Sequence, residues 1–350
     1  MRISQQQSGP SGQGRVRDSL WLAAALAAVL LISGGSPAVA QVAQPEASGT
    51  SADGFSISDA ELHSPLTFIV YGDMRFTDTA ETDAAWPGPR QALVQKIAAE
   101  PGDVLFLTGD IPWHGGDPKD YQQFTLETAP WREQHLRVYP VLGNHEFSDC
   151  EEAACLQAWW QAFPQLAGRR WYALALGTRV RVLALDSNAS LLPGSAQRIW
   201  LEGELQSLPT GVRFVMLLLH HPPVANQGFL IVRNNERSLS RYLGRLAHSS
   251  QARFIVVSGH VHNYERFERD GVVYVVSGGG GAKPLPVLRE RDDKYRANLS
   301  PNFHFLRFTL QGDRLSAVMT RVEDPFAATP HIWAERDHFE LVAKAPSPRP

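Results

Sequence analysis

Five short apolar segments of this chain each run into a residue that can bind a metal ion, and this pattern constrains the fold more than any other feature. The segments are rich in β-branched residues, which favours buried strands. With the polar residues that follow them, they are residues 67–71 with Gly72-Asp73, 104–108 with Gly109-Asp110, 138–142 with Gly143-Asn144-His145-Glu146, 213–219 with His220-His221-Pro222-Pro223, and 254–258 with Gly259-His260-Val261-His262. In open α/β sheets ligands bind beyond the carboxyl ends of the strands, so we expect all five endings to converge on one crevice.

The last of these endings places two imidazoles close together. His260 and His262 are separated by one residue, and on an extended backbone both side chains point to the same side beyond the end of the strand. This arrangement suits metal ligation, although a polar turn with two solvated histidines would contain the same residues. The matching chemistry of the other endings favours the metal site. Each glycine before a polar residue is expected to let the backbone turn sharply there.

Short apolar runs alternate with longer helix-like segments along the chain, which is typical of a layered α/β fold. Further strands are predicted at residues 171–176, 180–185, 272–277, 303–310 and 315–322, the last two joined by a turn at Gln311-Gly312-Asp313. Helices are predicted at residues 90–100, 121–127, 153–163, 196–207 and 238–247. The sequence shows no internal repeat and no second linker, so we expect one domain over residues 65–345.

Residues 1–40 are typical of a secretory signal peptide. Three arginines precede an apolar run from Leu20 to Ile32, and Ala38-Val39-Ala40 supplies the small residues of a cleavage site. An uncleaved anchor is the alternative, but the run is short for a bilayer span. We expect a periplasmic or secreted protein with a disordered linker at residues 41–64, a disordered tail at residues 346–350 and no membrane span after cleavage.

The formal net charge of the chain is −3, and removal of the signal peptide would make it about −5. A chain without excess positive charge offers no general binding surface for nucleic-acid phosphates. A negatively charged ligand would therefore need local positive charge, such as a metal ion.

The chain contains two cysteines, Cys150 and Cys155. In an oxidising compartment two close cysteines are expected to form a disulfide, and catalytic or zinc-binding use is the alternative. Five residues of a continuous α-helix rise about 7.5 Å, which exceeds the usual Cα separation in a disulfide of roughly 4.4–6.8 Å. A disulfide therefore requires Cys150 to lie in a loop, with any helix beginning after it.

The five strand endings resemble those of the calcineurin-like metallophosphoesterases, and within them the purple acid phosphatase branch. The best match is Gly259-His260-Val261-His262-Asn263-Tyr264-Glu265-Arg266, and the resemblance extends from about Leu66 to Ser277 in the family's order and spacing. It implies an α/β fold in which a two-sheet β-sandwich is flanked by helices, in four layers ordered α/β/β/α. It also implies two metal ions at the strand ends.

The resemblance implies a set of metal ligands at these endings. Asp73 and His262 would bind the first ion, and Asp110 would bridge both ions. The second ion would also be bound by Asn144, His220 and His260. His220 is preferred to His221 because the family pattern reads His-x-Pro and because His220 directly follows the apolar run.

The same resemblance assigns roles next to the metals. His145 would protonate the leaving oxygen. Glu146 would orient His145 or be a surface carboxylate. His221 would line the phosphate pocket or be exposed. Carboxylate, amide and imidazole ligands suit Fe, Zn or Mn better than Ca. Two such ions neutralise phosphoryl oxygens and lower the pKa of a bound water, which gives a metal-bound hydroxide for in-line attack.

Arg75 is a departure from the family, most members of which have histidine two residues after the first aspartate. Arginine has no lone pair for a metal, so the first site lacks one expected ligand. Three alternatives follow: water completes that site, the site is empty, or Arg75 points inward and holds a phosphate oxygen. A position outside the site, paired with a surface carboxylate, is a further alternative. We expect a weak first site with Arg75 near the substrate.

Loops beyond the strand ends are expected to determine the substrate. Candidate pocket residues are Trp113 and His114, which follow Asp110, together with Asn188 and Tyr264. Residues of these types are more often simply packed or surface residues of a loop.

The leading hypothesis is an exported metal-dependent phosphoesterase that hydrolyses monoesters of small phosphorylated substrates. A phosphodiesterase of the same fold, acting on nucleotide or glycerophospholipid-type diesters, is the first alternative. A secreted binding protein with a degenerate metal site and no catalysis is the second. Because a monoester carries an additional negative charge, a cationic Arg75 in the pocket favours the first hypothesis.

Overall fold

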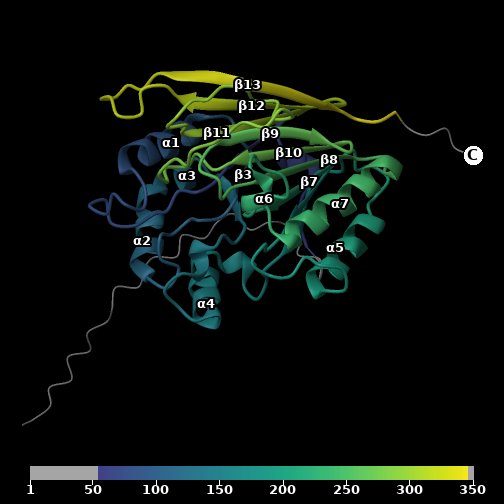
Figure 1. Ribbon diagram of the computed structural model, residues 1–350, viewed down its shortest axis with the longest axis horizontal. Coiled ribbons are helices and arrows are strands. Elements are labelled where there is room, and N and C mark those ends of the chain that lie inside the picture. The colour runs from purple at the N-terminus through teal and green to yellow at the C-terminus, as the bar shows by residue number, and fades with distance from the viewer. Residues whose placement is uncertain (1–53, 346–350) are drawn as a thin grey trace, which may run out of the picture. The chain divides into compact units, whose positions relative to one another are not determined.

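The computed structural model describes residues 54–345, which form two mixed β-sheets flanked by helices (Figure 1). The seven-stranded sheet has the order β1 (Phe55–Ile57), β5 (Tyr172–Leu176), β6 (Val180–Ala184), β7 (Phe214–Leu219), β8 (Arg253–Ser258), β10 (Val272–Ser277), β9 (Tyr264–Arg269). The six-stranded sheet has the order β13 (Trp333–Val342), β12 (Arg314–Val322), β11 (His304–Gln311), β2 (Leu66–Tyr71), β3 (Val104–Leu107), β4 (Arg137–Pro140). The predicted α/β fold class is confirmed.

The helices lie between these strands in the chain. The α-helices are α1 (Pro87–Ala99), α2 (Pro118–Glu127), α3 (Ala129–Glu133), α4 (Glu152–Ala162), α5 (Ala196–Gln206), α6 (Gly228–Ile231) and α7 (Asn234–Ser249). The short 3-10 helices are η1 (Asp59–Glu61), η2 (His145–Phe147) and η3 (Pro164–Leu166). The predicted signal peptide at residues 1–40 and the predicted tail at residues 346–350 lie outside the described residues.

The seven-stranded sheet is buried on both faces, as its continuous apolar strands require. In β7, Phe214, Met216 and Leu218 belong to the main core, which also contains the strands of the six-stranded sheet. The alternate residues of β7 face a second core, which Leu201 of α5 and Leu243 of α7 complete. Figure 1 shows α5 and α7 together beside β7 and β8. Successive side chains of a strand point to opposite faces, which explains this division.

Parallel pairing brings the carboxyl ends of the site-bearing strands to common edges. Strands β2, β3 and β4 are parallel neighbours in the six-stranded sheet, and β7 and β8 are parallel neighbours in the other. The remaining strands of the six-stranded sheet, β11 to β13, pair in antiparallel fashion. The loops after β2, β3, β4, β7 and β8 can therefore form one site between the two sheets.

The predicted linker at residues 41–64 extends too far, because ordered structure is already present at β1. Phe55 packs against Tyr139 and Tyr172, with ring centroids 5.6 and 5.5 Å apart, and β1 pairs with β5. Two buried apolar residues are enough to add this edge strand. Strands β9 and β13 and helices α3 and α6 were also not predicted. Both strands are rich in charged residues and lie at sheet edges, where apolar alternation is weak.

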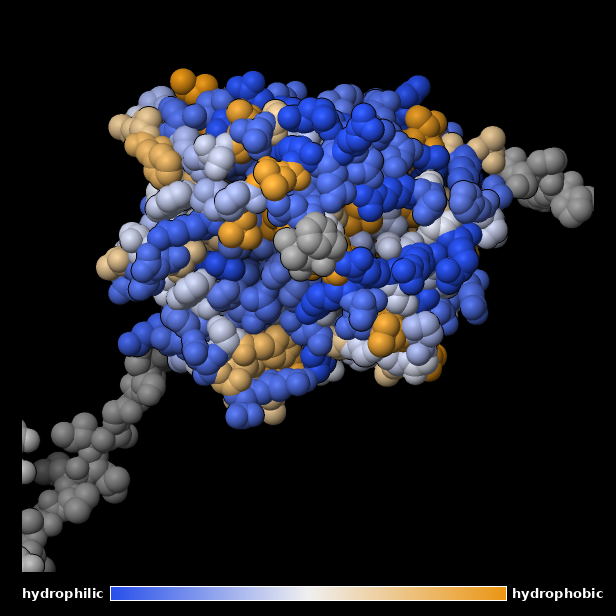
Figure 2. Space-filling view, viewed as in Figure 1, coloured by the Kyte–Doolittle hydropathy of each residue, from blue (hydrophilic) through white to orange (hydrophobic). Residues whose placement is uncertain are grey.

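The described surface carries few large apolar groups. No helix within residues 54–345 is long and apolar enough to cross a bilayer. The face shown in Figure 2 is mostly hydrophilic, with hydrophobic side chains in scattered patches. Exposed apolar residues of this kind are ordinary for a folded domain.

Candidate metal centre

Predicted ligands from distant parts of the chain meet at the ends of the two sheets. Asp73, Asp110 and His220 each offer one ligand atom, and these atoms lie within 4.8 Å of one another. The same is true of His220, His221 and His260. Because β2, β3, β7 and β8 each deliver a short polar loop, the site needs no insertion or additional domain.

The loops approach each other so closely that glycine is required at several positions. A Cβ atom on Gly143 would lie 2.4 Å from the Asp110 backbone nitrogen, and one on Gly259 would lie 2.3 Å from Oδ2 of Asp73. The sharp turn, by contrast, often falls on the polar residue itself, since Asp73 and Asp110 have φ angles of 64° and 53°. The sequence interpretation of these glycines as turn residues was therefore incomplete.

Replacing Gly109 by alanine is expected to destabilise the fold by about 3 kcal/mol, because it combines backbone strain with overpacking. Gly109 has a φ of 90°, and its Cβ would lie 2.6 Å from the Gly143 nitrogen. Gly168 is the matched control, since its φ is 76° but no atom lies within 4 Å of its Cβ position. Gly168→Ala is expected to cost about 1 kcal/mol in urea unfolding. Equal losses would show that the close approach is unimportant.

The environment of His220 is suited to a cation. The Nδ1 atom donates to the Thr108 carbonyl oxygen at 2.9 Å, and burial lowers the pKa of His220, although Asp110 opposes this shift. In the neutral ring the proton is therefore on Nδ1, and Nε2 carries a lone pair. Nε2 lies 3.2 Å from Oδ1 of Asp110 and 3.1 Å from Oδ1 of Asn144. Three electron-pair donors without a proton between them fit a metal ion.

His260 completes this group, although its backbone is not extended as predicted. Its φ of 69° is left-handed, and its Nδ1 lies 3.1 Å from Oδ1 of Asn144. Together, Asp110, Asn144, His220 and His260 provide the carboxylate, amide and imidazole donors expected for the second metal ion.

His262 and Asp73 form the other half of the site. Nδ1 of His262 donates to the Lys283 carbonyl oxygen at 2.6 Å, an arrangement that also orients metal-binding histidines in proteins. Burial, and next the charge of Arg75, lower the pKa of His262 to about 3. Its Nε2 is buried without a hydrogen-bond partner and lies 3.6 Å from Oδ1 of Asp73. A cation between these two atoms would satisfy both.

The two aspartates are a buried pair of like charges. Burial, and next the charge of Asp110, raise the pKa of Asp73 well above its usual value. Burial also acts to raise the pKa of Asp110, but His220, His145 and Arg75 hold it below its usual value. Bound metal ions would remove the repulsion between the carboxylates. The donors described here therefore fit two cations that share Asp110.

Glu146 has a structural role that was not predicted. Its fully buried carboxylate accepts hydrogen bonds from the backbone nitrogens of Gly143 at 2.7 Å, Ile111 at 2.9 Å and Asp110 at 3.0 Å. Burial, and next the charge of Asp110, raise the pKa of Glu146 to about 8. Glu146 therefore joins the loop after β3 to the loop after β4, and it is not the surface carboxylate of one sequence interpretation.

His145 lies at the rim of the site, at the start of η2. Its backbone nitrogen donates to Oδ1 of Asp110 at 3.0 Å, and its Nδ1 donates to the Trp113 carbonyl oxygen at 2.7 Å. Nε2 lies 3.8 Å from Oδ2 of Asp110. Burial lowers the pKa of His145, and Asp110 opposes this shift. This geometry leaves Nε2 available to a ligand bound beside Asp110.

Arg75 points into the site and is not paired with a surface carboxylate. Its Nη2 lies 3.1 Å from Oδ2 of Asp110, and its side chain is 14% exposed. Arg90 donates from Nη1 to the Arg75 carbonyl oxygen at 3.0 Å, and so holds this segment, in which Arg75 has a φ of 50°. Asp110 therefore directs one oxygen toward His220 and the other toward a guanidinium.

His221 and Asn188 also lie close to the site. His221 is buried, its Nδ1 is 2.8 Å from Oγ of Ser187, and its ring centroid is 4.4 Å from that of His260. Exposure of His221, one of the two sequence interpretations, is wrong. The side-chain nitrogen of Asn188 donates to the Gly143 carbonyl oxygen and to Asp186, each at 3.0 Å. Asn188 thus supports the loop that carries Asn144.

Two further candidate pocket residues, His114 and Tyr264, differ in position. The side chain of His114 is 38% exposed and lies 3.4 Å from Asp120 and 3.5 Å from Asp149. Tyr264 belongs to β9 and is fully buried, with its hydroxyl 2.8 Å from Oδ2 of Asp337. Tyr264 therefore occupies a packed position, the more frequent of the two sequence interpretations, and does not form a pocket wall.

A disulfide joins Cys150 and Cys155, with Cα atoms 5.7 Å apart. Cys150 lies in a loop and α4 begins at Glu152, as the length argument requires. The Gly116 nitrogen donates to the Ser148 carbonyl oxygen at 3.1 Å. The disulfide thus closes the segment that follows His145. This segment contacts the loop after β3.

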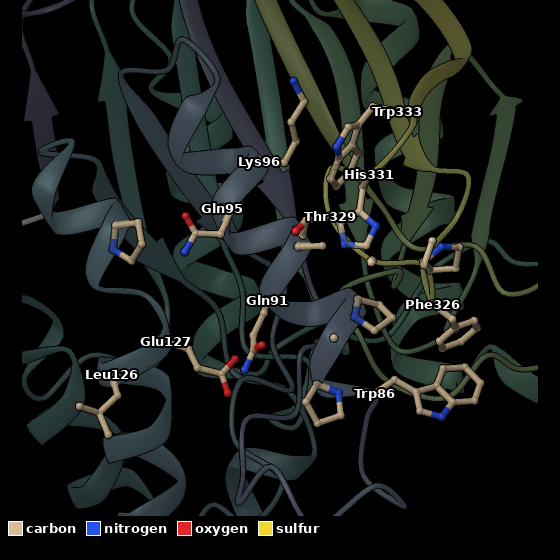
Figure 3. A pocket seen from close by; sticks show the side chains of 18 residues that line it. Trp86, Gln91, Gln95, Lys96, Leu126, Glu127, Phe326, Thr329, His331 and Trp333 are labelled. Atoms are coloured by element: carbon tan, nitrogen blue, oxygen red, sulfur yellow. The ribbon is translucent and has the colours of Figure 1, made fainter.

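A groove of about 1130 Å³ lies away from this cluster, between α1, the α2–α3 junction and the segment before β13 (Figure 3). Its walls include Trp86, Phe326 and Trp333. The charged groups in the groove are already paired, Lys96 with Glu100 at 2.6 Å and Glu127 with Arg90 at 2.5 Å. The groove therefore lacks the free positive charge that a phosphate ester requires.

Comparison with known proteins identifies the family. The profile of the calcineurin-like phosphoesterases matches residues 66–264. The chain is 22% identical to "Probable purple acid phosphatase 20" of Arabidopsis thaliana over 68% of this chain and 57% of the relative. It is 28% identical to a "Probable cyclic nucleotide phosphodiesterase" of Synechococcus over 50% of this chain and 64% of the relative.

The fold is also similar to that of a solved phosphatase. The purple acid phosphatase PPD1 from yellow lupin seeds superposes with a TM-score of 0.66 at 19% identity, over 81% of this chain and 55% of that protein. The chain therefore spans a little over half the length of these purple acid phosphatases. In this family a dinuclear metal site is implied, and the convergent donors at the strand ends fit it. The chain belongs to the calcineurin-like phosphoesterase family.

Proposed function

We propose that this protein is an exported phosphoesterase that hydrolyses phosphate monoesters with two metal ions bound at the strand ends. The observation that carries the monoester assignment is the position of Arg75, whose Nη2 lies 3.1 Å from Oδ2 of the shared ligand Asp110. A fixed guanidinium at this point adds positive charge beside the metal site. A monoester carries more negative charge than a diester and gains more from that charge.

The metal ligands proposed are those that meet at the strand ends. Asp73 and His262 hold the first ion, Asp110 both ions, and Asn144, His220 and His260 the second. When bound, the ions would supply Lewis-acid charge to the phosphoryl group and activate water for attack. Fe, Zn and Mn all suit this donor set. With Arg75 in place of a ligand, the first site is the weaker of the two.

The residues around the ions have separate tasks. Arg75 holds a non-bridging oxygen of the phosphoryl group by charge-assisted hydrogen bonds. His145 gives a proton from Nε2 to the leaving oxygen while its Nδ1 remains bonded to Trp113. His221 lies against His260 and contributes to the wall of the phosphate pocket.

A phosphodiesterase is the second candidate, because one relative carries the name of a cyclic nucleotide phosphodiesterase. Diesters bear a single negative charge and need room for a second ester group. The side chain of Arg75 is only 14% exposed. A small phosphorylated monoester, which has no second ester group, is therefore the better match to this site.

Export is supported by two features. Residues 1–40 have the sequence pattern of a signal peptide. The disulfide between Cys150 and Cys155 is of a kind that persists in oxidising compartments. We therefore propose a periplasmic or secreted location.

The proposal is tested with the chain beginning after residue 40, loaded with Mn, Zn or Fe. We expect kcat/KM for 4-nitrophenyl phosphate to exceed that for bis(4-nitrophenyl) phosphate by about tenfold or more. Arg75→Gln is expected to lower the monoester value by about 10- to 100-fold, because a hydrogen bond to a charged group is worth about 1.5–3 kcal/mol. The diester value should change little.

The control is Arg241→Gln, which changes an exposed arginine of α7. Elemental analysis of each variant separates loss of metal from loss of phosphate binding. A preference for the diester would favour the phosphodiesterase, and absence of turnover with every metal would favour a binding protein.

A further inference from the structure

Trp113 lies where the guanidinium of Arg75 and the imidazole of His145 meet. It follows the shared ligand Asp110 by three residues, in the loop after β3. Its indole ring is stacked on the imidazole of His145, with centroids 4.6 Å apart and an interplanar angle of 18°. The guanidinium carbon of Arg75 lies 5.0 Å from the indole centroid. One side chain thus contacts both groups that face Oδ2 of Asp110.

The backbone of Trp113 fixes the proton of His145. The Trp113 carbonyl oxygen accepts hydrogen bonds from Nδ1 of His145 at 2.7 Å and from Oγ of Ser148 at 3.0 Å. The Trp113 nitrogen donates to the Phe76 carbonyl oxygen at 3.0 Å. Since a carbonyl oxygen only accepts, Nδ1 carries hydrogen and Nε2 is the atom that faces the site.

The contacts of this indole differ from those of a core tryptophan. Trp131 and Trp159 belong to the main apolar core, and Trp86 and Trp333 pack against it. The aromatic and cationic groups in contact with the indole of Trp113 are Arg75, His114 and His145. Stacking of this kind restricts an imidazole and a guanidinium without burying much apolar area.

We propose that Trp113 is a positioning residue that enables the site to hydrolyse alkyl phosphate monoesters, whose leaving alcohols are poor. This inference rests on the proposed phosphomonoesterase function. Trp113 holds Nε2 of His145 and the guanidinium of Arg75 on the same side of Asp110. The proton donor and the phosphate-binding group therefore reach the reacting ester together.

The reaction shows why positioning matters more for alkyl than for aryl esters. A water oxygen bonds to phosphorus, the bond from phosphorus to the ester oxygen breaks, and its electron pair stays on that oxygen. The leaving oxygen takes a proton from Nε2 of His145, the water releases a proton to solvent, and His145 is reprotonated from solvent. An alkoxide needs this proton, whereas 4-nitrophenolate leaves without it. Displacement of the donor by about 1 Å costs up to roughly 100-fold.

The test compares Trp113→Ala and Trp113→Phe with the unchanged, metal-loaded protein on glycerol 1-phosphate and 4-nitrophenyl phosphate. For Trp113→Ala we expect kcat on glycerol phosphate to fall by about 100-fold and kcat on the aryl ester by less than about threefold. Trp113→Phe keeps a stacking ring and is expected to recover most of the loss. Trp333→Ala, which removes an indole at the start of β13, should leave the ratio of the two substrates unchanged.

Other outcomes would overturn the inference. An equal loss on both esters, no loss on either, or no recovery in Trp113→Phe would show that the indole does not position the proton donor. Metal content and the midpoint of thermal unfolding are measured for each variant, and loss of either in Trp113→Phe would indicate a structural role. If the unchanged protein hydrolysed neither ester with any metal, the proposed function itself would fail. These results are distinguishable.

Discussion

Replacing Asp110 by asparagine is expected to remove most metal binding and to lower kcat/KM by about 10³-fold or more. Metal ions supply several kcal/mol of transition-state stabilisation, and each 1.36 kcal/mol is a factor of ten. Asp110 is fully buried, and its two oxygens face His220 and Arg75. Asparagine tolerates the φ of 53° at this position, so the backbone should be retained. Elemental analysis and steady-state kinetics measure both effects.

Asp103 provides a matched control at the other end of β3. It is also buried and accepts hydrogen bonds from the backbone nitrogens of His63 at 2.9 Å and Thr67 at 3.2 Å. Asp103→Asn is expected to lower stability while leaving metal content and turnover per folded molecule unchanged. If Asp110→Asn kept its metal and its activity, the assignment of Asp110 as the shared ligand would be wrong.

Replacing His145 by alanine is expected to lower kcat for an alkyl phosphate ester by about 10²–10⁴-fold, the range of general acid catalysis. Metal content should remain unchanged, because His145 contacts Asp110 through its backbone nitrogen, which alanine retains. The loss should be larger for an alkyl ester than for 4-nitrophenyl phosphate. Elemental analysis together with kcat for both substrates tests this expectation.

His248→Ala is the control for a change of histidine as such, since His248 is exposed in the last turn of α7. Its kinetics should match those of the unchanged protein. Full activity of His145→Ala would mean that another group protonates the leaving oxygen, and loss of metal would point to a supporting role for the imidazole.

The fold and the cluster of candidate ligands were predictable because their signals are local. A short apolar run followed by a polar residue identifies both a strand and its carboxyl end, as at Val104–Leu107 followed by Asp110. A turn at Gln311-Gly312-Asp313 was also predicted from a local signal, and in the structure β11 and β12 pair directly around Gly312 and Asp313. Because ligands bind beyond the carboxyl ends of such strands, His220 and Asp110 were expected to meet at one crevice, although their strands lie in different sheets.

The remaining features depend on contacts between distant loops, which local patterns do not reveal. Glu146 binds backbone amides on two loops, and the carbonyl oxygen of Lys283 orients His262. Trp113 was a candidate wall residue, but its stacking on His145 depends on how two loops pack. Strand β9 did offer a signal in the sequence, because the dipeptide Asp270-Gly271 is typical of a hairpin turn. In the structure both residues have positive φ and form the turn between β9 and β10.

The proposed metal ligands are divided between the two sheets, and this division has a consequence for the stability of the domain. Asp73, Asp110 and Asn144 follow strands of the six-stranded sheet, while His220, His260 and His262 follow strands of the seven-stranded sheet. An ion held by both groups would act as a cross-link through the middle of the sandwich. At a free ion concentration 100 times the Kd, such a ligand contributes about 2.7 kcal/mol to folding. A chelator would then weaken the protein as a whole, as well as its chemistry.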